Sequence, residues 1–449
     1  MNTRLHSRSR GGGPLDRRVV AGFPPLCLTL AILAARSWTR LSFPQLWGED
    51  GRVFTAQALS AGWSSLLQPM HGSFFTIQRS FVLLSLDVLP LEWLPAAIAF
   101  ACVLLTAVVF SRIASDDYAW ILPERGVRVT LAGLFCLLPG LTEMLGNLCN
   151  TNWILYCWAS LQGMKDPARP PTRTELVLLA ICMVSMGTSI LLLPLFLWRL
   201  GRALRSGRRD SRRAEIGQIA VLVVLGFGLI LAAGHPREVS STSTTALVLG
   251  GIWLDQVMDL ILVAPWVGDR AAAWLLANAH GAGYVAAAAA SVAVLSAATW
   301  RLSRDEAWGP HVALWAAGTS AWTVLASLVR PNALGILQFV HDERLYAMRY
   351  SFVCSFVALL WWVSVVAWAG RSRGLGRWPV LAYAVLVAAA SWHRWEIPAY
   401  GAADKWGPAV AALDGSIRSG CPPIVLVGQY PDDWFFGYRS PIAREDCSR

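Results

Sequence analysis

The sequence has few charged residues, and lysine is almost absent from it. Charged side chains make up 15% of the 449 residues, against about a quarter in an ordinary soluble protein. Lysine occurs only at Lys165 and Lys405, so arginine supplies almost all of the positive charge. Hydrophobic residues make up 55% of the chain and gather in runs of roughly 14 to 23, about the length that crosses a bilayer. These features exclude a soluble enzyme, a disordered protein and a disulfide-rich secreted scaffold, and they predict an all-α polytopic membrane protein.

The sequence also lacks the common signatures of nucleotide-binding and hydrolytic sites. It holds no Walker motif, no dinucleotide-binding fingerprint, no GxSxG and no HExxH. No cysteine spacing is typical of a zinc site. The absence of an ATP-binding motif argues against a primary pump.

The net charge of +10 is concentrated in short segments between the hydrophobic runs. These segments are residues 1–18, 112–128, 164–175, 199–215, 301–306 and 371–377. They hold 23 Lys/Arg and 10 Asp/Glu, so their net charge of +13 exceeds that of the whole chain. Because short basic loops stay in the cytoplasm, we predict that these segments are cytoplasmic. The positive charge is then a topology signal, and we expect no nucleic-acid partner.

The hydrophobic runs predict about 11 membrane segments within residues 19–391, with the N-terminus inside and the C-terminus outside. The single spans are 19–41, 93–112, 127–139, 153–163, 215–234, 281–300, 310–329, 350–369 and 378–391. The first run could instead be a signal peptide, but the long polar loop after it favours a retained span. Residues 176–199 have Arg-rich flanks on both sides and are interrupted at Gly187, so they predict a broken hairpin entering from the cytoplasm.

Polar stretches flank this membrane domain. Residues 1–18 predict a disordered basic tail in the cytoplasm. Residues 392–449 are too polar to re-enter the bilayer and predict a small outer α/β domain, with one amphipathic helix and a strand near 423–428. Cys421 and Cys447 are the only cysteines of this domain, so we expect a disulfide between them in an oxidising compartment.

The longest predicted outer loop, residues 42–92, carries an acidic pair near its start. Glu49 and Asp50 stand within the run Trp47-Gly48-Glu49-Asp50-Gly51. A carboxylate at a membrane surface can act as a general base on a sugar hydroxyl or ligate a divalent cation. The alternative is that the pair only marks a solvated loop. Residues 52–68 predict an amphipathic helix in the plane of the interface, and 74–89 predict a second helix.

Other predicted outer residues could bind a substrate. Arg344 and Arg349 suit a phosphate or pyrophosphate head group, although either could instead anchor the following span at the interface. Arg79 and His71 are candidates of the same kind. The polar cap of a helical hairpin, residues 142–153, could hydrogen-bond sugar hydroxyls or serve only as a helix cap. The polar residues of this cap are Glu143, Asn147, Asn150 and Asn152.

Together these features resemble the GT-C superfamily of integral-membrane glycosyltransferases, which take sugars from polyprenyl-phosphate carriers on the outer face. The hallmark of that family is an acidic motif in the first outer loop followed by an interfacial helix, which Glu49-Asp50 and residues 52–68 match in position. Arg349-Tyr350 at the start of a late span, and the small outer tail, are also similar to features of bacterial members. The acidic pair is Glu-Asp and not the Asp-x-Asp of metal-dependent members, so a Mg²⁺ or Mn²⁺ cofactor stays open.

The resemblance implies transfer of a sugar from a polyprenyl-phosphate donor to a glycan or lipid acceptor of the cell envelope, at the outer face of the plasma membrane. Asp50 would be the general base, and Glu49 would orient Asp50 or the acceptor. Arg349 and Arg344 would hold the lipid phosphate, and Tyr350 would be a further substrate-binding residue. Two alternatives stay open. A transporter or flippase of lipid-linked sugars would suit the broken hairpin, and a polysaccharide polymerase or ligase would also have many spans and outer loops.

Overall fold

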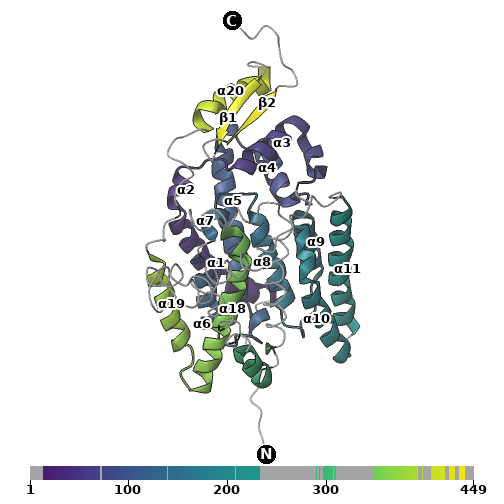
Figure 1. The fold of residues 1–449 in the computed structure, drawn as a ribbon, viewed down its shortest axis with the longest axis vertical. Coiled ribbons are helices and arrows are strands. Elements are labelled where there is room, and N and C mark those ends of the chain that lie inside the picture. Colours follow the sequence, from purple (N-terminus) through teal and green to yellow (C-terminus); the bar gives the residue numbers. More distant parts are fainter. Residues whose placement is uncertain are drawn as a thin grey trace, which may run out of the picture.

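The computed structural model is almost entirely helical, and the sheet in its described residues is a two-stranded hairpin near the C-terminus (Figure 1). The structure describes residues 14–70, 73–138, 140–207, 209–232, 348–392, 406–419, 424–429 and 434–439, residue 397, and short pieces within 290–309. The predicted helical fold with a small C-terminal α/β part is confirmed. Residues 1–13 and the predicted spans 281–300 (in most of its length) and 310–329 lie outside the described residues.

Long helices form a bundle, and each overlaps a predicted membrane segment or one arm of the predicted hairpin. They are α1 (Pro14–Arg36), α5 (Leu94–Ser111), α6 (Arg125–Phe135), α8 (Thr151–Met164), α9 (Arg173–Ser185), α10 (Leu193–Arg205), α11 (Arg209–Ala232), α18 (Met348–Ser372) and α19 (Trp378–Ala390). In the described residues, Leu91–Ala114 and Phe352–Ser372 are long and apolar enough to cross a membrane. The count of 11 crossings stays a prediction.

The first predicted span is divided between two helices. α1 begins at Pro14, inside the segment predicted to be a disordered tail; proline is favourable in the first turn of a helix. α1 ends at Arg36, whose guanidinium donates a hydrogen bond to the carbonyl of Cys136. The carbonyl of Arg36 accepts a bond of 2.7 Å from the N–H of Ile397. The short helix α2 (Trp38–Ser42) then leads to the acidic motif.

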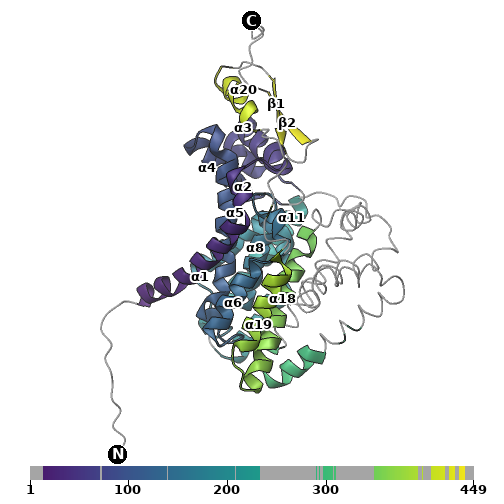
Figure 2. The same ribbon diagram turned by 90° about the vertical axis from the view of Figure 1, so that its left-hand side faces the viewer.

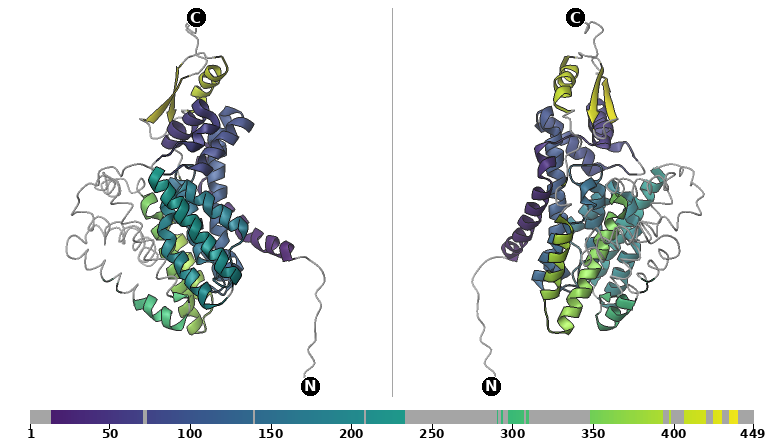
Figure 3. Two further views of the ribbon diagram at one scale, coloured as in Figure 1. Left: turned by 90° about the vertical axis from the view of Figure 1, so that its right-hand side faces the viewer. Right: turned by 60° about the vertical axis from the view of Figure 1, so that its left-hand side comes forward.

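α8 lies at the centre of the bundle. Every residue from Trp153 to Met164 is buried, and α5, α9, α10 and α18 pack around this helix. Figure 2 shows α5, α8 and α18 side by side, and Figure 3 shows the bundle from two further sides. Apolar side chains fill the space between the helices; the rings of Phe135 and Phe356, for example, stack with their centroids 4.1 Å apart. A helix with apolar side chains on most of its sides fits this central position.

The predicted broken hairpin has the expected interruption. α9 ends at Ser185, and the 3-10 helix η6 (Gly187–Leu192) connects it to α10. The first residues of α9 and the last residues of α10 lie close together, because both contact Lys165. The Lys165 side chain donates to the carboxylate of Glu175 in α9, and the Lys165 carbonyl accepts a hydrogen bond from Arg199 in α10. The last turn of α9 contacts the segment around Ile77, because the Ser185 hydroxyl accepts a hydrogen bond of 3.2 Å from the N–H of Ile77.

A second, smaller hydrophobic core lies at one end of the bundle, and we call the elements around it the cap (Figure 2). The cap consists of η1 (Asp50–Thr55), α3 (Ala56–Ala61), η2 (Gly62–Leu67), α4 (Thr76–Val88), η3 (Leu91–Trp93), α20 (Trp406–Ser419), β1 (Ile424–Gln429) and β2 (Trp434–Arg439). β1 and β2 are antiparallel, with Val427 opposite Phe436. The indole of Trp406 donates to the carbonyl of Glu92 at 3.2 Å, so the C-terminal helix and hairpin share one core with elements of residues 42–92.

Two predictions for the tail are confirmed and one for the loop is wrong. The tail helix and the strand near 423–428 are present as α20 and β1. Residues 52–68, however, are not one amphipathic helix: a π-helix, an α-helix and a 3-10 helix follow one another, and Gly62 at φ +56° ends the second of them. The packing instead buries Phe54 and Ala58, while Trp63 is exposed. An exposed tryptophan is still compatible with a membrane interface.

The basic segments that the structure describes meet at the end of the bundle away from the cap, which we call the basic end. Segments 112–128, 164–175 and 199–215 are joined by the contacts of Arg112 with Glu175 and of Arg199 with the Lys165 carbonyl. Segments 301–306 and 371–377 are joined by an ion pair of 3.0 Å between Arg371 and Glu306. Arg377 lies beside Gly126 and so links the two groups. If all of these segments lie on the same side of a membrane, they must be at the same end of the bundle, as they are here.

Gly163 provides a test of the packing around α8. A Cβ atom at this position would lie 2.9 Å from Cγ of Leu195 and would also meet Phe196, both in α10. Gly163→Ala is expected to lower the free energy of unfolding by about 1–3 kcal/mol, because overpacking forces side chains from their preferred rotamers. The measurement is thermal melting in detergent. Gly201→Ala is the control, since a Cβ atom there has nothing within 4 Å; equal melting temperatures for the two variants would contradict this packing.

Candidate functional site

Asp50 joins residues 42–92, the predicted first outer loop, to the start of α8. It is the first residue of the π-helix η1 and is fully buried. One carboxylate oxygen accepts a hydrogen bond of 2.8 Å from the N–H of Leu148, and the other accepts one of 2.8 Å from the N–H of Cys149. The backbone carbonyl of Asp50 accepts a third bond, of 2.7 Å, from the Thr55 hydroxyl. The predicted catalytic residue therefore has a defined position against the polar hairpin cap.

The protonation of Asp50 is set by opposing effects. Burial raises the pKa of its carboxyl, and the N–H groups of Leu148 and Cys149 lower it, while the nearby charge of Glu49 raises it further. The result is a pKa of about 8, far above the ordinary value of 3.8. A carboxyl group with a pKa near the working pH can both accept and release a proton, which is the property required of a general base.

Glu49 lies beside Asp50 but points to a different partner. Its carboxylate accepts a hydrogen bond of 2.6 Å from the indole N–H of Trp47. Its side chain is only partly buried. No bond between the Glu49 and Asp50 carboxylates is present among the described contacts, so Glu49 influences Asp50 through its charge.

Residues 142–153, the hairpin cap, lead from α7 (Leu141–Met144) into α8 and are distinct from the cap defined above. Hydrogen bonds among their own residues hold them in place. The amide oxygen of Asn147 accepts a bond of 3.0 Å from the N–H of Asn150, whose side chain donates to the carbonyl of Glu143 at 3.1 Å. Within the described residues, the amide nitrogen of Asn147 and the amide oxygen of Asn152 have no hydrogen-bond partner. Asn147 is fully buried, so an unpaired amide there is costly unless a ligand completes it.

Arg79 is the buried cation of the cap. Its guanidinium donates to the carbonyl of Phe74 at 2.9 Å and to the side chain of Gln57, and lies 5.4 Å from the centroid of the Phe54 ring. Cys149, which bonds Asp50, is also close enough to influence Arg79 electrostatically. In the described residues Nη2 has no hydrogen-bond partner and no carboxylate pairs with the guanidinium. Arg79 therefore belongs to the Asp50 neighbourhood.

For the other predicted site residues, the structure gives less information about their position relative to Asp50. Arg349 and Tyr350 are in the first turn of α18, which packs against α7, the short helix that carries Glu143. Glu143 is itself buried. His71, Arg344, Cys421 and Cys447 lie outside the described residues.

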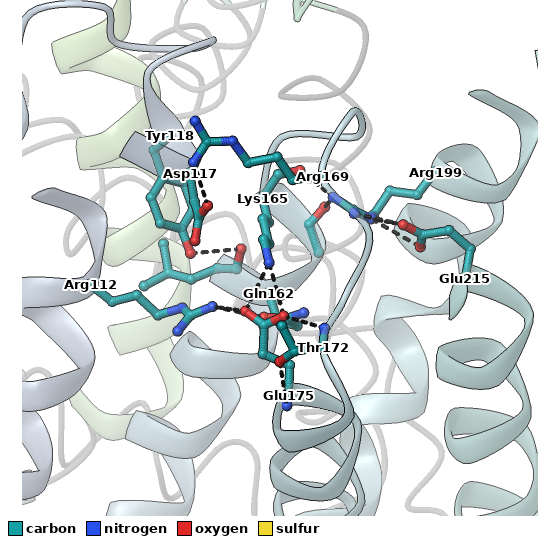
Figure 4. A network of polar contacts seen from close by, with 12 residues as sticks. Arg112, Asp117, Tyr118, Gln162, Lys165, Arg169, Thr172, Glu175, Arg199 and Glu215 are labelled. Atoms are coloured by element: carbon teal, nitrogen blue, oxygen red, sulfur yellow. Dashed lines mark hydrogen bonds and ion pairs between the residues drawn. The ribbon is translucent and has the colours of Figure 1, made fainter. Parts of the chain in front are cut away.

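A second polar cluster, at the basic end, was not predicted as a site. Arg112 and Lys165 both contact Glu175 (Figure 4). Their nitrogen atoms lie 2.5 and 2.9 Å from its carboxylate oxygens, and Arg199 pairs with Glu215 at 2.6 Å. In the sequence, these residues indicate only the topology of the chain. The one sequence signal available was the presence of acids among the arginines, at the first turn of α9 and in α11.

The arrangement around Asp50 does not fit a divalent cation. Both carboxylate oxygens already accept backbone N–H bonds. In the described part of the chain, no group of three or more His, Cys, Asp or Glu could hold a metal ion. We therefore derive no step through a metal.

No protein-family model, curated protein or solved structure matches this chain.

Proposed function

We propose that the protein is a membrane glycosyltransferase that uses a polyprenyl-phosphate sugar and that Asp50 is its general base. The observation that carries the proposal is the Asp50 carboxylate itself: it is fully buried, held by two backbone N–H groups, and has a pKa of about 8. Burial of a carboxyl group is expensive and strongly shifted carboxyl groups cluster at functional sites. The resemblance in sequence motif supports the same assignment.

In the proposed reaction, Asp50 takes the proton of an acceptor hydroxyl as that oxygen attacks the anomeric carbon, and the lipid phosphate leaves. Arg79 is a buried cation of the cap, and its unpaired Nη2 could stabilise charge on the leaving phosphate. Arg349 and Arg344 are proposed as further ligands of the same phosphate. Because Asp50 is fully buried, the acceptor reaches it only when the cap opens.

The proposed topology puts this site on the outer face. The cap and the basic end lie at opposite ends of the bundle, and the positive-inside rule places the basic end in the cytoplasm. The 11 crossings, the plasma membrane and the envelope acceptor are part of this proposal.

The test is a transfer assay with protein reconstituted into liposomes, a radiolabelled polyprenyl-phosphate sugar and a cell-envelope acceptor fraction. Label in the acceptor supports the transferase. Movement of the labelled lipid between leaflets without label in the acceptor would instead support a flippase, for which the broken hairpin of α9, η6 and α10 is a suitable element.

The pH dependence of transfer follows from the shifted carboxyl group. A general base must be ionised, and the ionised fraction of Asp50 grows as pH rises through its pKa of about 8. The value of kcat/KM is therefore expected to rise about tenfold per pH unit from about pH 6 towards about pH 8 and then to level off. Initial rates over this range, with melting temperature recorded at each pH, measure it. A profile that levels off near pH 5, as for an ordinary aspartate, would contradict the assignment.

A further inference from the structure

The peptide group between Leu148 and Cys149 is the last link of a hydrogen-bond chain that ends on Asp50. Its N–H group, at Cys149, donates to Oδ1 of Asp50 at 2.8 Å. Its carbonyl, at Leu148, accepts a hydrogen bond of 2.6 Å from the hydroxyl of Thr151. The same hydroxyl lies 3.2 Å from the amide nitrogen of Gln78, 73 residues away in the sequence. The peptide therefore connects Asp50 to two side chains that the sequence does not mark as site residues.

The direction of this chain follows from the groups that form it. A carbonyl oxygen can only accept, so the hydroxyl of Thr151 must use its one proton on Leu148. The hydroxyl oxygen is then the acceptor, and Gln78 donates to it through its amide NH2 group. Every bond therefore runs from Gln78 towards Asp50, and hydrogen bonds arranged in this way polarise one another. Gln78, Thr151 and Asp50 are all 0% exposed, so water does not weaken the effect.

The hydrogen-bond chain joins the cap to the bundle. Gln78 belongs to α4 of the cap, and Thr151 is the first residue of α8. A threonine hydroxyl often bonds a carbonyl one turn earlier, but here a donor from a distant helix is added. The turn before α8 does not depend on the hydroxyl, because the N–H of Thr151 also bonds the Leu148 carbonyl, at 3.1 Å. The bond of 3.0 Å from the N–H of Asn150 to the side chain of Asn147 supports the same turn.

We propose that Thr151 and Gln78 are positioning residues that orient and polarise the N–H group holding Oδ1 of Asp50. A more polarised N–H group stabilises the ionised carboxylate more than the protonated acid. It therefore lowers the pKa of Asp50 against the effect of burial, and the base is ionised at a lower pH. The inference rests on the proposed function for the role of Asp50 as general base, and it adds two residues that control the ionisation of that base.

Other ionisable side chains lie on the segment that carries Asp50 and on the elements near it. They are Glu49, Arg40 of α2, Arg79 of α4, Cys102 of α5, Glu143 and Cys149 of the hairpin cap, and Tyr438 of β2. Glu49 raises the pKa of Asp50 through its charge. None of these side chains is altered in the variants below, so a difference between the variants reports the hydrogen-bond chain.

The test is the ionisation of Asp50 in Thr151→Val, which removes the hydroxyl and keeps the branched shape of the side chain. Infrared difference spectra of the full-length protein in detergent follow the C=O stretch of the protonated carboxyl as pH rises, and Asp50→Asn identifies the band. The midpoint is expected at about 8 in wild type and about half a pH unit higher in Thr151→Val, because the N–H of Cys149 is less polarised. In the transfer assay, kcat/KM at about pH 7 is expected to fall about threefold.

Two further variants make the result specific, with melting temperature recorded for each. Thr151→Ser restores a hydroxyl at the same place, so its midpoint is expected to equal that of wild type. Thr106→Val removes an equally buried hydroxyl, which donates at 2.7 Å to the carbonyl of Cys102, one turn earlier in α5. Among the described contacts, that peptide group gives no bond to the Asp50 carboxylate, so no shift is expected. An unchanged midpoint in Thr151→Val, or an equal shift in Thr106→Val, would overturn the proposal.

Gln78→Met tests the first link of the chain. Methionine has a similar size but no donor, so the Thr151 hydroxyl stays and is less polarised, and the midpoint is expected to rise by less than in Thr151→Val. No rise in Gln78→Met would overturn the role of Gln78. The infrared midpoints do not depend on sugar transfer: the expected midpoints in a protein that transfers no sugar would support the hydrogen-bond chain and refute the glycosyltransferase. Transfer with unchanged midpoints would refute the hydrogen-bond chain alone.

Discussion

Asp50→Asn is expected to reduce sugar transfer by about 10²–10⁴-fold, the usual contribution of a general base. Asparagine has nearly the same shape as aspartate but cannot take up the proton of an acceptor hydroxyl. It also keeps only one oxygen for the two N–H groups of Leu148 and Cys149, so a loss of stability of about 1–3 kcal/mol is expected as well. Transfer is therefore measured with radiolabelled donor well below the melting temperature of the variant.

The control for this experiment is Asp87→Asn. Asp87 is an exposed carboxylate of α4 in the same cap, so its replacement makes the same chemical change without touching the site. Transfer at the wild-type rate by Asp87→Asn and a collapse in Asp50→Asn would locate the chemistry. If Asp50→Asn transfers sugar as fast as wild type, Asp50 only anchors the cap to α8, and the proposed mechanism is wrong.

Much of the helical structure was predictable because it depends on local pattern. The break of the α9 hairpin follows from Gly187 between two Arg-rich flanks, and α20 follows from an apolar face through Trp406 and Leu413. Each pattern lies within one continuous stretch of sequence. Predictions from such short-range patterns agree with the structure because tertiary packing buries the same apolar faces.

The prediction of a single interfacial helix over residues 52–68 is wrong for a physical reason. The apolar spacing was extended through Gly62, which takes a left-handed conformation and ends α3. Packing against the C-terminal strand and α4 then determined which side chains are buried, and it selected Phe54 and Ala58. Periodicity alone does not contain these long-range contacts.

The residue types and the segments of the candidate site were predictable, but the hydrogen bonds that join these segments were not. Asp50 and the polar hairpin cap were both singled out, yet the two bonds that join them span 98 and 99 residues of sequence. The pKa of about 8 depends on burial that only the packed cap creates. The basic end shows the same limit: its charges mark topology in the sequence, whereas their pairing into ion pairs is visible only in three dimensions.

The ion pair of Arg199 and Glu215 is expected to have the largest single effect on stability. The two side chains are 0% and 1% exposed, with Nη2 and Oε1 2.6 Å apart, and Arg199 also donates to the carbonyl of Lys165. Arg199→Met leaves a buried carboxylate without a partner, so a loss of about 3–5 kcal/mol in the free energy of unfolding is expected. Chemical unfolding in detergent micelles, followed by tryptophan fluorescence, measures it.

The double variant Arg199→Met with Glu215→Leu separates the cost of an orphaned charge from the value of the pair. Replacing both charges by apolar groups removes the desolvation penalty, so the double variant is expected to be more stable than Arg199→Met alone. Arg418→Gln is the surface control, because its ion pair with Asp414 is largely exposed and contributes little. Since Arg199 joins α10 to α11 and to the end of α8, a double variant no better than the single one would mean that this arginine stabilises the bundle through the Lys165 carbonyl and not through Glu215.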